Sequence, residues 1–250
     1  MSVTDLHHQP TDAPPQRDEH THATAHNAKP HADPHAAYYA ARASEYDVSV
    51  GYGTPLVERH LASLQARLQA NLKGHDALEL ACGTGYWTHA AAATARSILA
   101  TDRDAASLAL AQARMASSDH VRCQHADAYS LDGVSGRFSA AFALFWWSHM
   151  PKSKIPAFLS TLHSKLAPGA RVVFADQLPY EWRGNRHFDD EGNLLEERAL
   201  LDGTRFEIFK NFPTEAELAG LLTGTADDLV YSTGAEGRWW MISYRTASRA

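Results

Sequence analysis

The chain has 250 residues, 44% of them hydrophobic and 21% charged, which suits one globular domain of about 200 residues with an appendage. Its formal net charge of -6 argues against a nucleic-acid partner, because a phosphate backbone is normally bound by a basic face. No apolar run reaches the length of a membrane span, and the N-terminus lacks the order of a signal peptide. Cys82 and Cys123 have neither zinc nor disulfide spacing. We therefore expect a cytoplasmic protein with no membrane contact, no nucleic-acid partner and no metal.

Residues 1–35 differ in composition from the rest of the chain. They are rich in His, Pro, Asp, Thr and Ala and have almost nothing to bury, which predicts disorder. Their seven histidines would allow weak metal binding by a flexible tract, but a solvated tail without chemistry is the interpretation we favour. The folded domain is expected over residues 36–250.

In the folded part, helical and strand-like segments alternate. Residues 56–72 have apolar side chains at helical spacing, and Gly74 follows as a stop signal. Strands are then predicted at residues 76–81, 96–102, 120–127, 137–146 and 170–177. Helices are predicted from the first strand's glycine turn to about Ala95, at 103–116 and at 152–167. This alternation, with continuous apolar strands, predicts a parallel sheet covered by helices on both faces.

After the fifth strand the pattern changes. Asp202-Gly203 separates two short strand-like runs, which indicates a hairpin. Thr214 and Glu217 have the spacing of a capping box and open a helix at 215–222. Two closing strands follow, at 227–234 and 238–247. Residues 178–210 are therefore predicted to be an insertion that covers the active site.

Ligands of such sheets bind at the carboxyl ends of the strands, so the residues just after each strand deserve most weight. The first strand ends in Glu-Leu-Ala-Cys-Gly-Thr-Gly, where Gly83 and Gly85 allow a tight turn and close approach of a ligand. Thr88 stands where dinucleotide enzymes have a third glycine, which disfavours a dinucleotide phosphate. Asp102 ends the second strand, where a carboxylate can bind both hydroxyls of a ribose. Asp127 ends the third, where an adenine amino group would need an acceptor.

The motifs ELACGTGYWT, ATDRD, QHADAYSL and KLAPGARVVFAD resemble, in order and spacing, those of the class I S-adenosylmethionine (SAM)-dependent methyltransferases. The resemblance covers residues 38–245. It implies an α/β fold with a Rossmann-like seven-stranded, mostly parallel sheet whose last strand is antiparallel. It also implies SAM as cofactor, with S-adenosylhomocysteine (SAH) as its product.

The resemblance further implies which residues hold the cofactor. The glycine turn would hold the methionine part, Asp102 the ribose, and Asp127 with Ala128 the adenine. The segment YYAARASEYD would form an N-terminal lid, with Arg42 as a partner for the cofactor carboxylate. The full set of expected cofactor residues is Tyr39, Arg42, Tyr46, Glu79, Ala81, Gly83, Gly85, Asp102, Arg103, Asp127, Ala128 and Phe145. For Glu79 and Asp127, capping of a loop or helix is an alternative, and for the lid segment the alternative is an amphipathic helix packed on the core.

The acceptor side is less defined by the sequence. His149 follows the fourth strand and has a side chain whose ordinary pKa suits proton removal near neutral pH, so we take it as the catalytic candidate. Trp146 and Trp147 would form an aromatic wall, and Tyr180 and Arg186 in the insertion would contact the substrate. Trp239 and Trp240 are expected in the core.

We therefore expect a methyltransferase that acts on N or O of a small (hetero)aromatic metabolite in specialised metabolism, as a monomer or homodimer. The run Phe145-Trp146-Trp147-Ser148 lacks the Asn/Asp-Pro-Pro pattern of enzymes that methylate the amino groups of bases. Three alternatives stay open: a C-methyltransferase acting on a quinone-like ring, a nicotinamide-dependent oxidoreductase, and a SAM-binding module without catalysis.

Overall fold

The computed structural model describes residues 34–247. The His-rich tail predicted from the sequence lies outside the described residues, except for Pro34 and His35, which begin helix α1 (Pro34–Arg42). Within residues 34–247, none of the helices has both the length and the apolar character needed to cross a membrane.

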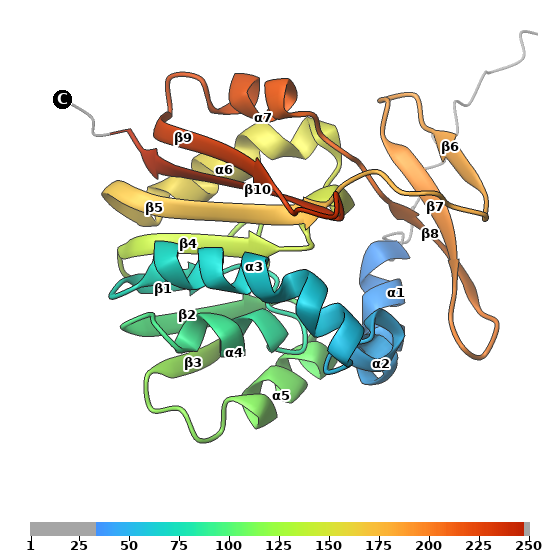
Figure 1. Cartoon of the computed structure of the whole chain (residues 1–250), viewed down its shortest axis with the longest axis horizontal. Helices are drawn as coiled ribbons and strands as arrows, with labels where there is room; N and C mark the ends of the chain where they lie inside the picture. The colour runs from blue at the N-terminus through green and yellow to red at the C-terminus, as the bar shows by residue number, and fades with distance from the viewer. Residues whose placement is uncertain (1–33, 248–250) are drawn as a thin grey trace, which may run out of the picture. The chain divides into compact units, whose positions relative to one another are not determined.

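Seven strands form one sheet, in the order β3-β2-β1-β4-β5-β10-β9 (Figure 1). Their bounds are β1 (Asp76–Glu79), β2 (Ser97–Asp102), β3 (Val121–His125), β4 (Phe138–Leu144), β5 (Leu166–Gln177), β9 (Ala226–Thr233) and β10 (Trp239–Thr246). The first five strands pair in parallel, and β10 runs antiparallel to both β5 and β9. The expectation of a Rossmann-like, mostly parallel sheet with an antiparallel last strand is confirmed.

Helices cover both faces of this sheet, because successive residues of its buried strands point to opposite sides. On one face, α3 (Pro55–Leu72), α4 (Tyr86–Ala92) and α5 (Ala105–Arg114) pack against residues such as Ala77 and Phe142. On the other face, α6 (Ile155–Ser164) and α7 (Glu215–Leu222) pack against residues such as Leu78 and Phe174. Trp239 and Trp240 are buried on opposite faces, as expected for core residues.

Several element boundaries differ from the sequence prediction. α6 ends at Ser164, and β5 begins at Leu166 instead of Ala170, because Leu166 pairs with Phe138 ahead of an irregularity in the β4–β5 register. The predicted helix end and Pro168-Gly169 therefore belong to a strand. α4 ends at Ala92, three residues earlier than expected.

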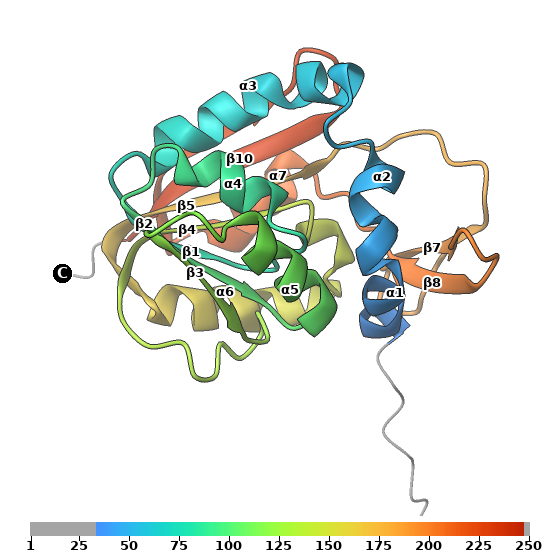
Figure 2. The same ribbon diagram turned by 90° about the horizontal axis from the view of Figure 1, so that it is seen from below.

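The remaining elements lie at the carboxyl edge of the parallel strands. After β5 the chain forms an antiparallel sheet of β6 (Arg186–Phe188), β7 (Leu194–Ala199) and β8 (Arg205–Phe209), of which β6 was not predicted. The N-terminal helices α1, η1 (Ala43–Glu45) and α2 (Tyr46–Val50) lie beside this small sheet (Figure 2). Tyr38 of α1 packs on Phe206 of β8 with ring centroids 5.5 Å apart. These two groups of elements flank the place where the parallel strands end.

Candidate active site

The turn between β1 and α4 is shaped by residues with positive φ. Ala81, Gly83 and Gly85 have φ values of 50°, 55° and 80°. A Cβ on Gly85 would lie 2.9 Å from the Cα of Ala111, so glycine is required there for α4 to approach α5. Phe145, just after β4, also has positive φ, at 55°. Strained backbone in non-glycine residues often marks functional sites, and here it occurs at the ends of two adjacent strands.

Asp102 joins the glycine turn to the end of β2. Its Oδ2 accepts a hydrogen bond of 2.8 Å from the Gly83 amide, and its Oδ1 accepts one of 2.8 Å from the Asp104 amide. Burial raises the pKa of this carboxyl, and the two amide donors oppose that effect. Asp127, after β3, similarly accepts a hydrogen bond of 2.8 Å from the Tyr129 amide, so it caps a turn as well as facing the cavity.

A first cavity, of about 360 Å³, lies over these strand ends. Ten of the twelve residues expected to hold the cofactor line it: Tyr39, Tyr46, Glu79, Ala81, Gly83, Asp102, Arg103, Asp127, Ala128 and Phe145. The carboxylates in its wall are Glu79, Asp102, Asp104 and Asp127, against two cations, Arg103 and Lys154. This cavity therefore has an acidic lining.

Glu79 is the most perturbed of these acids. Its side chain is buried, and among the described residues Oε2 has no hydrogen-bond partner. Burial, with a smaller contribution from the charge of Asp102, raises the pKa of Glu79 to about 8. An acid held this way at a cavity wall suits a ligand that brings a positive charge.

A second cavity, of about 540 Å³, lies beneath the small sheet and beside α1 and α2. The cations that line it are Arg42, Arg198, Lys210 and Arg238, and there is no carboxylate among the described residues in its lining. Its charge is therefore opposite to that of the first cavity. The two cavities share Tyr39, Tyr46, Tyr52, Phe145 and His149.

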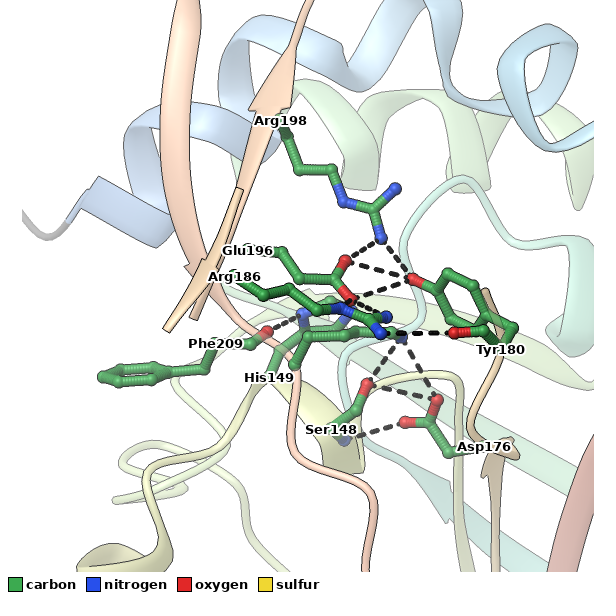
Figure 3. Close-up of polar contacts among 9 residues, drawn as sticks. Ser148, His149, Asp176, Tyr180, Arg186, Glu196, Arg198 and Phe209 are labelled. Carbon is green, nitrogen blue, oxygen red and sulfur yellow. Dashed lines mark hydrogen bonds and ion pairs between the residues drawn. The ribbon is translucent and has the colours of Figure 1, made fainter. Parts of the chain in front are cut away.

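His149, in the turn η2 (Trp147–His149), belongs to this shared wall. Its Nδ1 lies 2.8 Å from the backbone oxygen of Phe209 (Figure 3). A carbonyl oxygen can only accept, so in the neutral ring Nδ1 carries the proton and Nε2 is the basic nitrogen. The Tyr39 ring packs edge-on against the imidazole at 5.4 Å.

Two residues that follow β8, Lys210 and Asn211, form hydrogen bonds to Ser148, which precedes His149 in η2. Lys210 donates a hydrogen bond of 2.9 Å to Ser148 Oγ, and Asn211 donates from its amide to the Ser148 oxygen at 2.8 Å. Asp176, fully buried at the end of β5, accepts from the Ser148 amide at 2.8 Å and lies 3.6 Å from the Lys210 ammonium. Burial lowers the pKa of Lys210, while Asp176 opposes that shift. His149 is thus fixed from both β5 and the small sheet.

A second buried acid organises the small sheet. Glu196 is fully buried and forms ion pairs with Arg186 and Arg198 (Figure 3). Tyr180 donates a hydrogen bond to Glu196 Oε2 at 3.1 Å. Arg198 also lies over the Trp182 ring, 4.0 Å from its centroid. Glu196 stands behind the cavity wall, and it directs Arg198 into the lining.

Five expected site residues lie elsewhere than predicted. Trp147 is 2% exposed and packs on Phe174 and Trp240, so it belongs to the core and reaches neither cavity.

The other four differ in what they contact. Arg42 lines the second cavity instead of the first, because Ser49 and the Tyr46 ring hold its guanidinium. Trp146 lines the first cavity instead of the second. Gly85 shapes the turn without lining either cavity. Arg186 donates a hydrogen bond to the Tyr180 backbone oxygen and also lines neither cavity.

Sequence reasoning missed the residues that define the second cavity's chemistry. The sequence pattern places Lys210 and Arg198 only in strand-like runs, and Asp176 only near the end of a strand. A lysine within the apolar run FEIFKNF and an aspartate closing a buried strand were the available signals, since such charges are rarely buried without partners.

The chain is similar to known methyltransferases in sequence and in structure. A family model described as a methyltransferase domain matches residues 77–169. The solved structure of DhpI with SAH has 30% sequence identity and a TM-score of 0.68, covering 86% of this chain and 97% of DhpI. A DhpI–SAM–HEP complex, also 30% identical, has a TM-score of 0.71 and coverages of 85% and 96%. No curated protein sequence matches the chain.

More distant structures share the fold. The N-methyltransferase NodS from Bradyrhizobium japonicum WM9, solved with SAH, has 15% identity and a TM-score of 0.59, covering 86% of this chain and 99% of NodS. The family-model match and the likeness to DhpI show that the chain belongs to the class I SAM-dependent methyltransferase family. It is an enzyme whose cofactor is SAM.

The first cavity fits this cofactor on the chain's own features. SAM supplies an electrophilic methyl group on a positively charged sulfonium and also carries an ammonium group. The carboxylates of Asp102, Asp104 and Asp127 in the lining match a ligand of that charge, and Oε2 of the buried Glu79 side chain offers an acceptor for the ammonium. Asp102 would hold the ribose, as its place after β2 implies.

The raised pKa of Glu79 makes SAM affinity depend on pH. Below about pH 8 the free protein keeps a proton on Glu79, whereas the bound ammonium requires the carboxylate, so binding releases a proton. We expect SAM affinity to rise between pH 6 and pH 7.5, by up to about tenfold per pH unit. Calorimetry in buffers of different ionisation enthalpy measures both the affinity and the proton release.

Glu79→Gln is the control for this prediction. The amide keeps the size of the side chain but does not titrate, so its SAM affinity should be weaker and almost independent of pH. An equal pH dependence in both proteins would show that another group is responsible.

Proposed function

We propose that the enzyme transfers a methyl group from SAM to an oxygen or nitrogen of a small acceptor that carries an anionic group. The observation that supports this most is the opposite charge of the two cavities. Carboxylates prevail in the first cavity and cations in the second, and the two meet at His149. Electrostatic attraction would thus favour a cationic cofactor in the first cavity and an anionic acceptor in the second, on either side of the residues that the two cavities share.

The cations of the second cavity are suited to an anchoring role. Lys210 is 3% exposed and Arg198 is partly buried, so a bound anion would interact with them in a medium of low dielectric constant. Asp176 and Glu196 sit behind these cations and hold them in place. An anion within reach of Lys210 would also raise its lowered pKa and keep the ammonium charged.

The second cavity also contains several aromatic rings. Tyr38, Tyr39, Tyr46, Tyr52 and Tyr180 contribute rings to its lining. Flat rings of this kind pack well against a flat ligand, which supports a (hetero)aromatic acceptor with an acidic substituent. The conjunction of rings and cations favours methylation on O or N over the quinone-like ring of the C-methyltransferase alternative, because a quinone ring carries no charge for these cations to bind.

His149 is our candidate for the catalytic base. Nδ1 is committed to the Phe209 oxygen, so Nε2 is the atom that would accept the proton lost by the acceptor's hydroxyl or amine as the new C–O or C–N bond forms. Tyr39 and Phe145, which share the wall with His149, would align the acceptor and keep water out.

The DhpI complex with SAM and HEP supports a site that holds the cofactor together with a second component. We extend this arrangement to the present chain as part of the proposal, with the acceptor in the second cavity. A small-molecule acceptor in place of nucleic acid, a cytoplasmic location, and a monomeric or homodimeric state remain predictions from the sequence.

Removal of the base tests the assignment of His149. We expect His149→Ala to lower kcat by about 100-fold or more, since a positioned general base contributes about 10²–10⁴-fold, with the Kd for SAM within a factor of two of wild type. Turnover is followed by methyl transfer from labelled SAM.

His120→Ala is the matched control, because His120 directly precedes β3, at the opposite end of that strand from the first cavity, and contacts the Ala92 oxygen. It should have wild-type turnover. Unchanged turnover in His149→Ala would exclude His149 as the base.

The charge of the acceptor is tested by separating a cell extract on an anion exchanger before the reaction. Each fraction is then incubated with the enzyme and labelled SAM. We expect the acceptor to be in the retained fractions. Labelling confined to the unretained fraction would overturn the anionic acceptor while leaving methyl transfer itself intact.

With that acceptor in hand, Arg198→Gln should raise its KM by roughly tenfold to hundredfold, the range that corresponds to about 1.5–3 kcal/mol for a hydrogen bond to a charged group. The KM for SAM should stay the same. Arg205→Gln, which breaks a similar but exposed pair with Glu197 on the neighbouring strand, is the matched control. Equal effects of the two substitutions would contradict a direct role of Arg198.

A further inference from the structure

Three residues connect the N-terminal helices to the cofactor turn. They are Asp47 of α2, Thr84 between the two glycines of the turn, and Arg114, the last residue of α5. Thr84 Oγ1 donates a hydrogen bond of 2.6 Å to Asp47 Oδ1. Arg114 donates from Nη1 to the Thr84 backbone oxygen at 2.8 Å, and its Nη2 forms an ion pair with Asp47 Oδ2. We call this group the clamp.

The clamp joins α2 to the glycine turn and to α5, which lie on opposite sides of the first cavity. Thr84 lines that cavity from the side of the sheet. Tyr46, next to Asp47 in the chain, lines it from the opposite side and also belongs to the wall shared with the second cavity. A change in the turn is therefore transmitted directly to the helix that bears a wall residue.

The geometry of the clamp makes it more than an ordinary surface ion pair. The Asp47 and Arg114 side chains are only 29% and 30% exposed, so solvent screens their charges less than those of open surface pairs. Each carboxylate oxygen of Asp47 has its own donor, and Arg114 binds two different groups. Such a network restrains the orientation of α2 relative to the glycine turn more than a single contact would.

The lid has further attachments on either side of the clamp. Tyr52, just after α2, stacks on Tyr86 of α4 with ring centroids 3.7 Å apart and accepts a hydrogen bond of 3.2 Å from Trp87. At the other end, Tyr38 packs on Phe206 of the small sheet. Of these attachments only the clamp reaches the glycine turn itself.

We propose that the clamp is a positioning device that keeps residues 36–50 closed over the bound cofactor and so sets how long SAM and SAH stay bound. Asp47 and Arg114 are positioning residues in this sense: they act on the cofactor through Thr84 and Tyr46. Opening of the clamp would release α2 from the turn and allow the cofactor to leave. The inference rests on the SAM-binding site alone and does not depend on the nature of the acceptor.

The test is the dissociation rate of SAH from the full-length protein. Trp146 and Trp87 line the first cavity, so tryptophan fluorescence in a stopped-flow instrument follows release after dilution or displacement by excess SAM. We expect Asp47→Ala and Arg114→Ala each to raise the SAH dissociation rate at least tenfold and to raise the KM for SAM, with the melting temperature nearly unchanged. The double variant should be no more than about twice as fast as either single variant, because each substitution breaks the same network.

Two further variants keep the test decisive. Asp47→Asn retains an acceptor for Thr84 but loses the charge, so its SAH dissociation rate should exceed that of wild type, and this comparison holds even if the alanine variants fold poorly. Arg96→Ala breaks the pair with Asp76, the first residue of β1 and so at the opposite end of that strand from the glycine turn, and should leave the rate unchanged.

Salt gives an independent reading of the same interaction. Dissociation of SAH from wild type should accelerate with ionic strength, and that dependence should be lost in Asp47→Ala. SAH dissociation within twofold of wild type in the Asp47 and Arg114 variants, or an equal acceleration in Arg96→Ala, would overturn the proposal.

Discussion

The hydrogen bond from the Gly83 amide to the Asp102 carboxylate connects the ends of two neighbouring strands, and much of the structure depends on it. It fixes a turn whose backbone has positive φ and whose second glycine packs directly on α5. This turn places Thr84 within hydrogen-bond distance of Asp47 in α2. It also keeps Glu79, at the end of β1, in the lining of the first cavity. One buried carboxylate therefore organises the cofactor site, and the raised pKa of Asp102 reflects what its burial costs.

Charge separates the two halves of the site. Buried charges are tolerated when other groups neutralise or hydrogen-bond them, and here each half does this differently. On the proposed acceptor side, Asp176 and Glu196 lie behind Lys210 and Arg198 and satisfy them in part, which leaves the cations directed at the cavity. On the cofactor side, Glu79 Oε2 has no hydrogen-bond partner among residues 34–247 and would gain one from the ligand. The wall between them, with His149 held by the Phe209 oxygen, is the place where the two ligands would meet.

The sequence predicts most of the residues that line the first cavity, because the constraints on them are local. A short strand, a glycine turn and an acidic residue at the next strand end follow one another within about 25 residues, and the positions of Glu79, Asp102 and Asp127 follow from the parallel sheet. The acceptor half depends on contacts between distant segments. Lys210 meets Ser148 and Asp176 across separations of 62 residues and more than 30 residues, which periodicity does not reveal.

Trp147 is a second case in which the sequence does not predict where a side chain points. It is adjacent to Trp146 in the chain, yet the η2 turn sends one ring to the cofactor cavity and the other into the core against Trp240. Arg42 is the last residue of α1, in the segment predicted to form the lid, and its stacking on Tyr46 directs it to the second cavity. In both cases the local segment was identified, and the side chain's direction was set by tertiary packing.

We propose that cofactor and anionic acceptor occupy oppositely charged cavities that share His149. A crystal structure of the enzyme with SAH and inorganic phosphate tests this most directly. We expect SAH in the cavity lined by Glu79 and Asp102, and a phosphate within hydrogen-bond distance of Lys210 Nζ or the Arg198 guanidinium. A phosphate bound only among the residues of the first cavity, or SAH in the second, would contradict it.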